Sequence, residues 1–216
     1  MAIRTNYCAN PSFEANPTGL CTGLTVFKSI TGVPVYSKVA AICGSGSFAQ
    51  RIQYAGVAGD AGGKMLSLYF AAYPLVAADV VAISGVVLGS ISGATMVLEM
   101  LNQAWGSATG PAVAVSPTST ANRYSAIGPM SAGTTSSFFR ISFSAIHEGD
   151  AIDITIDDAL IEKSAALGAY FDGSYSFCHW TEVANASASI SSGLTVAPVL
   201  PRLQTRILAQ GVMQCD

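Results

Sequence analysis

The sequence predicts an all-β protein, an antiparallel jelly-roll β-sandwich followed by an extended C-terminal arm. Three observations support this prediction. Helical periodicity is nearly absent from the 216 residues. Gly or Pro interrupts the chain about every ten residues, a spacing typical of sandwiches and barrels. The segments between these interruptions are short and alternate apolar with polar residues, as half-buried strands do.

Nine segments fit this pattern, a number that two antiparallel sheets of a jelly roll accommodate. Two of them, Lys64–Tyr73 and Ser137–Ile146, are rich in aromatic residues, which suits strands with one face in the core. The last segment alternates three isoleucines with Asp153, Thr155 and Asp157. In chain order the predicted strands are Leu24–Ile30, Ser37–Cys43, Phe48–Tyr54, Lys64–Tyr73, Val80–Leu88, Thr95–Asn102, Arg123–Ile127, Ser137–Ile146 and Ala151–Ile161.

Two segments depart from the strand pattern. Ala104–Asn122 is rich in Ser, Thr, Ala, Pro and Gly and is predicted to be a long loop at one end of the sandwich. Ser191–Asp216 contains Pro198 and Pro201 and has no core of its own, so we expect an arm that pairs with another subunit. The predicted division is a sandwich over residues 1–165, then a linker and extension over 166–216 that makes inter-subunit contacts.

The composition indicates a subunit of an assembly. Charged residues make up only 11% of the chain against 50% hydrophobic residues, and the net charge is −3. Soluble domains normally contain about 25% charged residues. The surface is therefore either small and neutral or covered by neighbouring chains, other copies of this chain included.

Several partner classes are not expected. The ten Lys and Arg residues are scattered without a basic run, which argues against nucleic acid. No window of about 18 apolar residues indicates a membrane span, and the N-terminus lacks the pattern of a secretory signal. The five cysteines are odd in number and never spaced Cys-x-x-Cys, so they are expected to be free, mostly buried thiols.

No pattern marks a catalytic site, and we expect no enzyme. The two histidines, His147 and His179, lie in no metal-binding spacing, and no Gly-x-Ser-x-Gly elbow is present. Two alternatives stay open at this point. A Ser-His-Asp triad can assemble from distant residues, and the acidic residues Glu14, Asp157, Asp158 and Glu162 offer the carboxylate pair of a glycosidase.

Three motifs in order resemble carbohydrate-binding-module-like jelly rolls of minor tail proteins from tailed bacteriophages. The opening has Arg-Thr-Asn at 4–6 and Asn-Pro-Ser-Phe-Glu at 10–14. The last predicted strand ends in Asp-Asp-Ala-Leu-Ile-Glu at 157–162, and Tyr-Phe-Asp-Gly follows at 170–173. Trp180 and Asn-Ala-Ser-Ala-Ser at 185–189 are similar to the family's closing motif. Between Lys28 and Pro129 only the rhythm of the strands matches.

The resemblance implies a structural calcium ion. In the family, the Glu of the opening motif lies beside an Asp of the last strand, which transfers to Glu14 and Asp157, with Asp158 as the alternative. The other interpretation is that these carboxylates cap turns or accept backbone N–H bonds. The family's opening continues with a Gly-Trp pair, whereas this chain has Gly-Leu-Cys at 19–21.

Sugar recognition needs exposed aromatic rings, and the candidates are Trp105, Tyr73 and Tyr124, with Tyr54 as a further one. Trp105 stands out because it lies in a polar loop, although a loop Trp can also fold back onto the sandwich. Tyr170, Phe171 and Trp180 are expected to pack against a sheet or a neighbouring chain, as assembly contacts.

The favoured function is a non-enzymatic virion protein of a tailed phage, a minor tail protein that acts as scaffold or adhesin. It would bind other virion proteins, copies of itself and a host-surface glycan. It would be made in the host cytoplasm and located in the virion tail. The alternative is a capsid decoration or head-fibre protein on the capsid surface that binds no sugar. A third interpretation is an accessory module of a carbohydrate-active enzyme.

Overall fold

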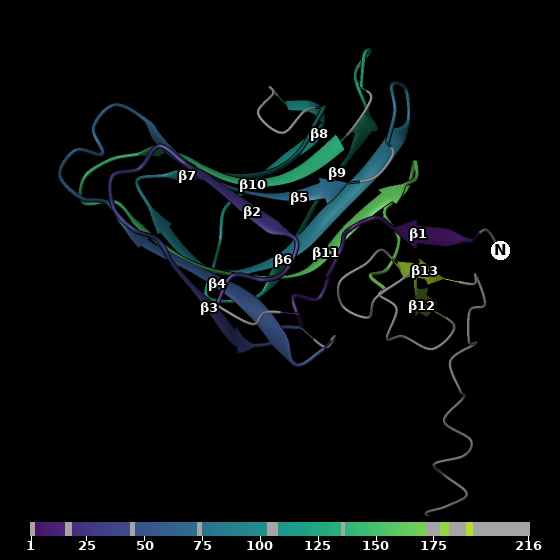
Figure 1. Cartoon of the computed structure of the whole chain (residues 1–216), viewed down its shortest axis with the longest axis horizontal. Helices are drawn as coiled ribbons and strands as arrows, with labels where there is room; N and C mark the ends of the chain where they lie inside the picture. Colours follow the sequence, from purple (N-terminus) through teal and green to yellow (C-terminus); the bar gives the residue numbers. More distant parts are fainter. Residues whose placement is uncertain are drawn as a thin grey trace, which may run out of the picture.

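The fold is all-β and consists of two five-stranded sheets packed face to face, with a small third sheet at one end (Figure 1). A computed structural model describes residues 3–15, 19–43, 46–72, 75–102, 108–134, 137–171, 178–181 and 189–191. Within these ranges no helix is long and apolar enough to span a membrane. The strands are β1 (Arg4–Asn6), β2 (Leu24–Lys28), β3 (Val35–Ala40), β4 (Phe48–Ala55), β5 (Lys64–Ala72), β6 (Val80–Ser92), β7 (Thr95–Leu101), β8 (Ala108–Val115), β9 (Asn122–Pro129), β10 (Ser137–Ile146), β11 (Ala151–Lys163), β12 (Cys178–Trp180) and β13 (Ser189–Ser191).

The first sheet has the strand order β2-β5-β10-β7-β8, and the second has the order β3-β4-β11-β6-β9. Every pair of neighbouring strands in both sheets is antiparallel. The predicted jelly-roll sandwich is therefore confirmed.

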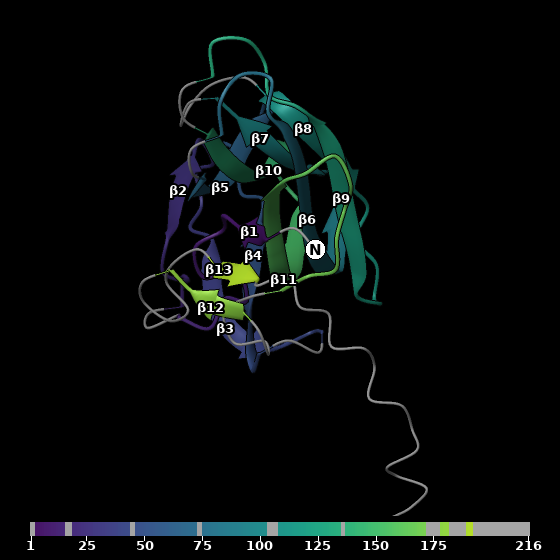
Figure 2. The same ribbon diagram turned by 90° about the vertical axis from the view of Figure 1, so that its right-hand side faces the viewer.

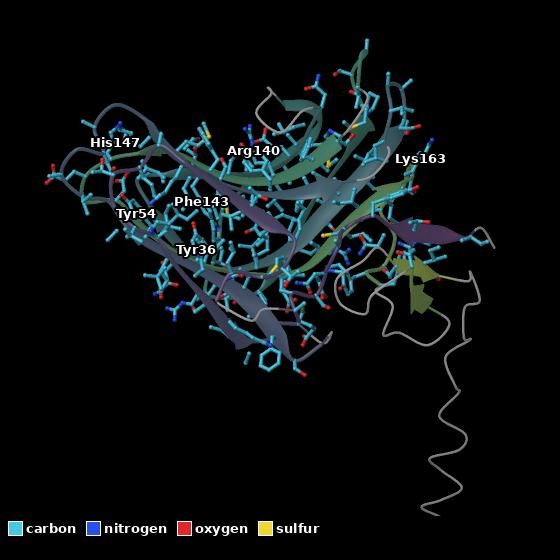
Figure 3. All side chains as sticks on the ribbon, in the orientation of Figure 1. Tyr36, Tyr54, Arg140, Phe143, His147 and Lys163 are labelled. Carbon is cyan, nitrogen blue, oxygen red and sulfur yellow. The ribbon has the colours of Figure 1, made fainter. Side chains whose placement is uncertain are left out.

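The core lies between the two sheets and follows from the alternation seen in the sequence. Phe139, Ile141 and Phe143 of β10 point into it from the first sheet and are fully buried. The isoleucines of β11 enter it from the second sheet and are at most 2% exposed. Side chains fill the space between the sheets (Figure 3). The same alternation directs the intervening residues of each strand to the outer faces, where ligands and partners can reach them.

The third sheet joins the two ends of the described chain. β1 pairs with β13, so that Arg4 lies opposite Ser191, and β13 also pairs with β12. This sheet lies beside the end of β11 (Figure 2). Ser189–Ser191 therefore forms a strand with β1 of the same chain, although the arm was predicted to begin at Ser191. Residues 192–216 lie outside the described ranges.

One predicted loop contains a strand. β8 (Ala108–Val115) lies inside the predicted loop Ala104–Asn122, and it includes Gly110 and Pro111, which disfavour strands. β8 tolerates them because it is the edge strand of the first sheet. Proline has no backbone N–H group, but an edge strand has a neighbour on one side only. A proline whose nitrogen faces the other side therefore removes no hydrogen bond between strands.

Candidate functional site

The candidate site is the outer face of the first sheet, which is the concave side of this bowed sheet (Figure 1). Three strands place polar side chains side by side in its middle. Tyr69 of β5 lies opposite Arg140 of β10, and Arg140 lies opposite Glu99 of β7. Two residues away on each strand, and thus on the same face, Ser67 lies opposite Ser142. We call these five residues the polar row.

The polar row is held together by Glu99. Arg140 Nε donates to Glu99 Oε1 at 2.8 Å, and Ser142 Oγ donates to the same oxygen at 2.9 Å. The Arg140 guanidinium also lies 6.0 Å from the centre of the Tyr69 ring. Glu99 is only 6% exposed, so its charge needs this partner, because a buried unpaired carboxylate is strongly destabilising.

The polar row is unusually well covered for an outer face. Tyr69 and Ser142 are each 5% exposed, and Ser67 is completely buried. The Ser67 Oγ atom has no hydrogen-bond partner among the described residues. A buried hydroxyl normally has a partner, so a buried water molecule is expected beside this one.

Two of the three predicted sugar-binding aromatics, Tyr73 and Trp105, lie outside the described residues. The connectivity nevertheless shows where their segments leave the sheet. Tyr73 follows Ala72, the end of β5, and Trp105 lies in the connection from β7 to β8. Ala72 pairs with Ser137, and Leu101 pairs with the next residue of β10. The described residues Ala72 and Leu101, after which these two segments begin, therefore lie at the same end of the first sheet.

Tyr124 and Tyr54 do not contribute to this face. Tyr124 is in β9 of the second sheet, opposite Gly85, and it packs against the core. Its hydroxyl donates to the Ser116 carbonyl. Tyr54 is buried, and its hydroxyl donates to Asp60.

The acidic residues of β11 form a cluster with a cysteine that the sequence did not suggest. One carboxylate oxygen each of Asp157 and Asp158 and the Cys43 thiol lie within 4.8 Å of one another. Asp157 accepts backbone N–H groups from Ile42 at 3.3 Å and from Asp158 at 2.9 Å. Burial, together with the charge of Asp158, raises the pKa of Asp157 to about 7.

Glu14 is not a member of that cluster. Its Oε1 atom accepts the backbone N–H groups of Ser47 at 2.5 Å and Phe48 at 2.8 Å. Glu14 and Asp157 therefore both accept backbone N–H bonds, as the second interpretation of the sequence expected.

The cluster meets the needs of calcium only in part. Calcium takes about six to eight oxygen ligands, and two carboxylates supply at most four. The third member is a thiol whose pKa is raised by burial, so it stays protonated, and sulfur is a soft ligand. Calcium held by Glu14, Asp157 and Asp158 stays a prediction.

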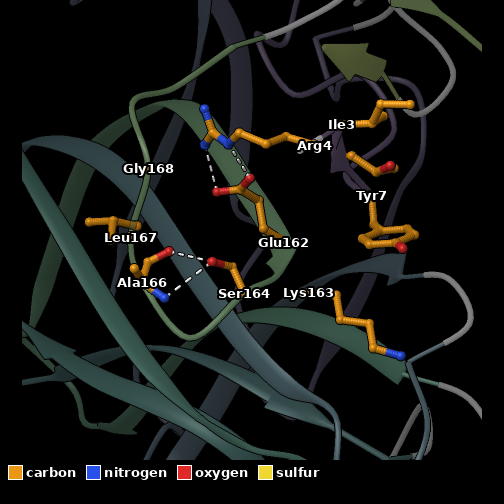
Figure 4. A pocket seen from close by; sticks show the side chains of 10 residues that line it. Ile3, Arg4, Tyr7, Glu162, Lys163, Ser164, Ala166, Leu167 and Gly168 are labelled. Carbon is orange, nitrogen blue, oxygen red and sulfur yellow. Dashed lines mark hydrogen bonds and ion pairs between the residues drawn. The ribbon is translucent and has the colours of Figure 1, made fainter. Parts of the chain in front are cut away.

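The opening motif has a clear structural role. Arg4 donates from Nε and Nη2 to the two carboxylate oxygens of Glu162, both at 2.7 Å, beside a hollow of about 490 Å³ (Figure 4). The Arg4 guanidinium also donates to the Ala169 carbonyl and lies 4.6 Å from the centre of the Phe171 ring. The sequence offered a signal for this pairing, because Arg4 and Glu162 belong to two of the three motifs.

Asn6 binds the same three segments together. Its side-chain N–H groups donate to the carbonyls of Ala159 and Phe171, and its oxygen accepts the N–H groups of Ile161 and Cys8. Asn6 is fully buried, so all of its hydrogen-bonding capacity is used inside the chain.

The residues predicted as assembly contacts pack within the chain where they are described. Tyr170 is 9% exposed and Phe171 is 4% exposed, and both contact Leu160 on the outer face of β11. Little of their surface is left for a neighbouring subunit. Trp180 is in β12, but its side chain lies outside the described residues.

Comparison with known proteins supports the fold. No family model matches the sequence, and no curated protein matches it. Among solved structures, an enzymatically active domain of tailspike protein 4 from bacteriophage CBA120 is similar, with a TM-score of 0.54 and 12% identity over 72% of this chain. This chain spans only 21% of the length of that tailspike chain.

Two further structures illustrate the range of proteins with similar sandwiches. A Stig cyclase from Fischerella sp. TAU has a TM-score of 0.53 and 10% identity, over 77% of this chain and 100% of its own. The carbohydrate-binding module TmCBM61, solved in complex with β-1,4-galactotriose, has a TM-score of 0.49 and 20% identity, over 74% and 99%. The tailspike domain and the cyclase share the β-sandwich fold of this chain, and at 10–12% identity the likeness extends to the fold alone.

Proposed function

We propose that this chain is a structural virion protein of a tailed phage, of the minor tail protein type, which binds a host-surface glycan. The observation that carries the proposal is the polar row on the concave outer face of the first sheet, near the strand ends Ala72 and Leu101. The sandwich fold shared with a phage tailspike domain and the three ordered motifs support it.

The chemistry of the polar row suits a sugar. Arg140 presents N–H donors, Glu99 presents an acceptor, and together they match two neighbouring hydroxyl groups of a glycan. Tyr69 is only 5% exposed, so we assign it the role of packing against Arg140, and we propose that Trp105 and Tyr73 supply the apolar cover for a sugar ring. Binding would thus combine a few well-placed polar contacts with apolar cover, as small-molecule sites generally do.

We propose binding without catalysis. Glu99 is the only carboxylate in the five strands of the first sheet, and it is already paired with Arg140. Glycoside hydrolysis by the usual route needs two carboxylates on either side of the bond that is cut.

The second candidate is a capsid decoration or head-fibre protein that binds no sugar. The low share of charged residues, 11%, favours it equally, because permanent contacts between virion subunits bury neutral surface. The two candidates differ in whether the concave face has a ligand.

Co-sedimentation with host cell walls tests the proposal. Purified protein is mixed with intact walls and with walls stripped of polysaccharide, beside the Trp105→Ala and Tyr69→Ala variants. We expect binding to intact walls alone, a loss of roughly tenfold or more in Trp105→Ala, since truncating an aromatic hot spot costs about 2 kcal/mol or more, and a smaller loss in Tyr69→Ala, whose ring only supports Arg140. Tyr124→Phe, on the second sheet, is the matched control and should bind like wild type. A folded wild type that does not sediment with intact walls would contradict glycan binding and favour the second candidate.

A further inference from the structure

The outer face of the second sheet has two adjoining hollows. One, of about 580 Å³, is lined by Val39, Leu88 and Ser119 among others. The other, of about 510 Å³, is lined by Val33, Val35, Val57 and their neighbours. Asp153 of β11 lines both, so the two hollows form one continuous surface. We call this surface the paired hollows.

In the described part of the chain, one half of this outer face is covered by a following segment and the other half is exposed. Towards the end of β11, Leu160 is fully buried beneath Tyr170 and Phe171 of the following segment. Near the start of β11, where the paired hollows lie, the valines are exposed. Val33 is 80% exposed and Val35 is 56% exposed. Exposed apolar side chains that gather beside a hollow mark an interaction surface.

The charges of this surface form one balanced doublet. Among the residues that the structure describes, Arg51 and Asp153 are the only charged ones that line the paired hollows. Arg51 Nε and Nη2 donate to the two oxygens of Asp153 at 2.7 and 2.6 Å, and Gln53 donates to the same carboxylate at 3.1 Å. Their side chains are 38% and 43% exposed, so both charges can still be reached by a partner.

We propose that the paired hollows bind a second copy of this chain, related to the first by a two-fold axis that passes between Arg51 and Asp153. An axis in this place puts Arg51 of each copy against Asp153 of the other, so four charges alternate in sign. A two-fold interface must be self-complementary, and a doublet of one cation and one anion fulfils this requirement. The valines on either side would then be buried against each other.

A charged partner fits this surface less well. The doublet has no net charge, so neither nucleic acid nor an acidic or basic peptide finds an excess of the opposite sign. The interface also leaves the glycan face free, because the outer faces of the two sheets point in opposite directions (Figure 1). The inference rests on the proposed virion role, in which copies of the chain associate, and not on the binding of a sugar.

Complementary charge reversal tests the interface. Arg51→Asp gives each copy two anions at the axis, and Asp153→Arg gives each copy two cations. We expect wild type to sediment as a dimer in analytical ultracentrifugation, each variant alone to sediment as a monomer, and an equimolar mixture of the two to recover the dimer mass. Recovery in the mixture separates this role from the pairing within one chain, because neither variant regains its own internal pair.

Three further measurements complete the test. Val35→Lys should also give a monomer, while Lys64→Asp, in the first sheet, should leave the dimer unchanged. Thermal melting of each variant establishes that it is folded. A wild type that stays monomeric up to its solubility limit overturns the inference, and so does a dimer that survives both charge reversals. The cell-wall assay reads the other face, so failure of the interface and failure of glycan binding are distinguished.

Discussion

At the scale of single residues, the opening motif acts as a clamp on the last long strand. Arg4 binds the carboxylate of Glu162, and Asn6 donates hydrogen bonds to the carbonyls of Ala159 and Phe171. The two ends of the Arg4–Glu162 pair differ in exposure, since the side chain of Arg4 is 31% exposed and that of Glu162 is 4% exposed. This asymmetry predicts which substitution is more harmful.

Arg4→Ala should lower the free energy of unfolding more than Glu162→Gln does. Removing the arginine leaves a buried carboxylate without its cation, which costs about 3 kcal/mol or more in buried pairs. Removing the negative charge leaves an arginine that water can still reach, and the glutamine can keep one hydrogen bond. Guanidinium unfolding of the two variants and of the double variant measures the difference. Equal losses would show that the pair is effectively at the surface.

Asp157 predicts an unusual dependence of stability on pH. Its pKa is raised from 3.8 to about 7 in the folded chain. At a pH between these two values, the Asp157 carboxyl is protonated in the folded state and ionised in the unfolded state. The free energy of unfolding should therefore fall as the pH rises from about 4 to about 7, by up to roughly 1.4 kcal/mol for each unit of the shift. Urea unfolding at several pH values, with a metal chelator in the buffer, measures how the free energy of unfolding changes with pH.

The control for that experiment is Asp157→Asn, which should remove most of the decrease in the free energy of unfolding between about pH 4 and pH 7. Below about pH 4 the trend should reverse in both proteins. Hydrogen bonds from Lys163 and Arg51 lower the pKa values of Asp79 and Asp153, so their contribution is lost as these groups become protonated. An identical slope in wild type and Asp157→Asn would mean that another group titrates.

The predicted calcium ion has a separate test. If Glu14 and Asp157 hold calcium, a chelator should lower the melting temperature of wild type but not that of Asp157→Ala. Tm is measured with added calcium and with the chelator for both proteins. The same response in both would exclude a stabilising ion at Asp157.

At the scale of elements, strand alternation was enough to find most of the sandwich. Lys64–Tyr73 and Ala151–Ile161 were predicted to within two residues of β5 and β11, because each runs through the core with a regular period. The alternation could not reveal the bulge in β11 near Asp158, whose φ of 50° comes from tertiary packing. β8 was missed because Gly and Pro mask an edge strand.

The candidate site was less predictable than the strands. Sequence reasoning selected aromatic residues, two of which belong to the segments that begin after Ala72 and Leu101. It missed Arg140 and Glu99, because their meeting depends on the register between β10 and β7, which are 36 residues apart at their nearest ends. Strand pairing across such separations leaves no trace in a single sequence.

The contact between two turns at one end of the sandwich is tight enough to require glycine. A Cβ atom on Gly56 would lie 1.9 Å from the His147 carbonyl oxygen, and the backbone N–H of Gly56 donates to the Asp150 carbonyl at 2.8 Å. Gly56→Ala should therefore lower the free energy of unfolding by about 2–3 kcal/mol through overpacking.

The matched control is Gly62→Ala in the turn before β5. Gly62 has a φ of +83° and open space around the position of a Cβ atom, so only backbone strain of about 1 kcal/mol is expected. Chemical unfolding of both variants separates the two effects. A smaller loss for Gly56→Ala than for Gly62→Ala would show that the turns can move apart.

At the scale of the whole molecule, the described fold closes on itself without residues 192–216. The third sheet ends at Ser191, where β13 lies between β1 and β12. Truncation after Ser191 should therefore leave a folded protein with a melting temperature close to that of wild type, but one that no longer enters particles. Truncation after Phe171 removes β12 and β13 and should lower the melting temperature, because β1 loses β13, the strand with which it pairs.

Differential scanning calorimetry and incorporation into virions are the two measurements. Unfolding of the chain truncated after Ser191 would show that the C-terminal residues belong to the sandwich. Full incorporation of the same protein would remove their proposed role in assembly.

The pairing of β1 with β13 also has a consequence for how the chain is made. A ribosome releases the first strand early, but its partner strand is separated from it by more than 180 residues of sequence. During synthesis the N-terminal residues must therefore wait, unpaired, until nearly the whole described chain has emerged. The third sheet therefore forms late during synthesis, and the Arg4 and Asn6 contacts are complete only after elongation has passed Phe171.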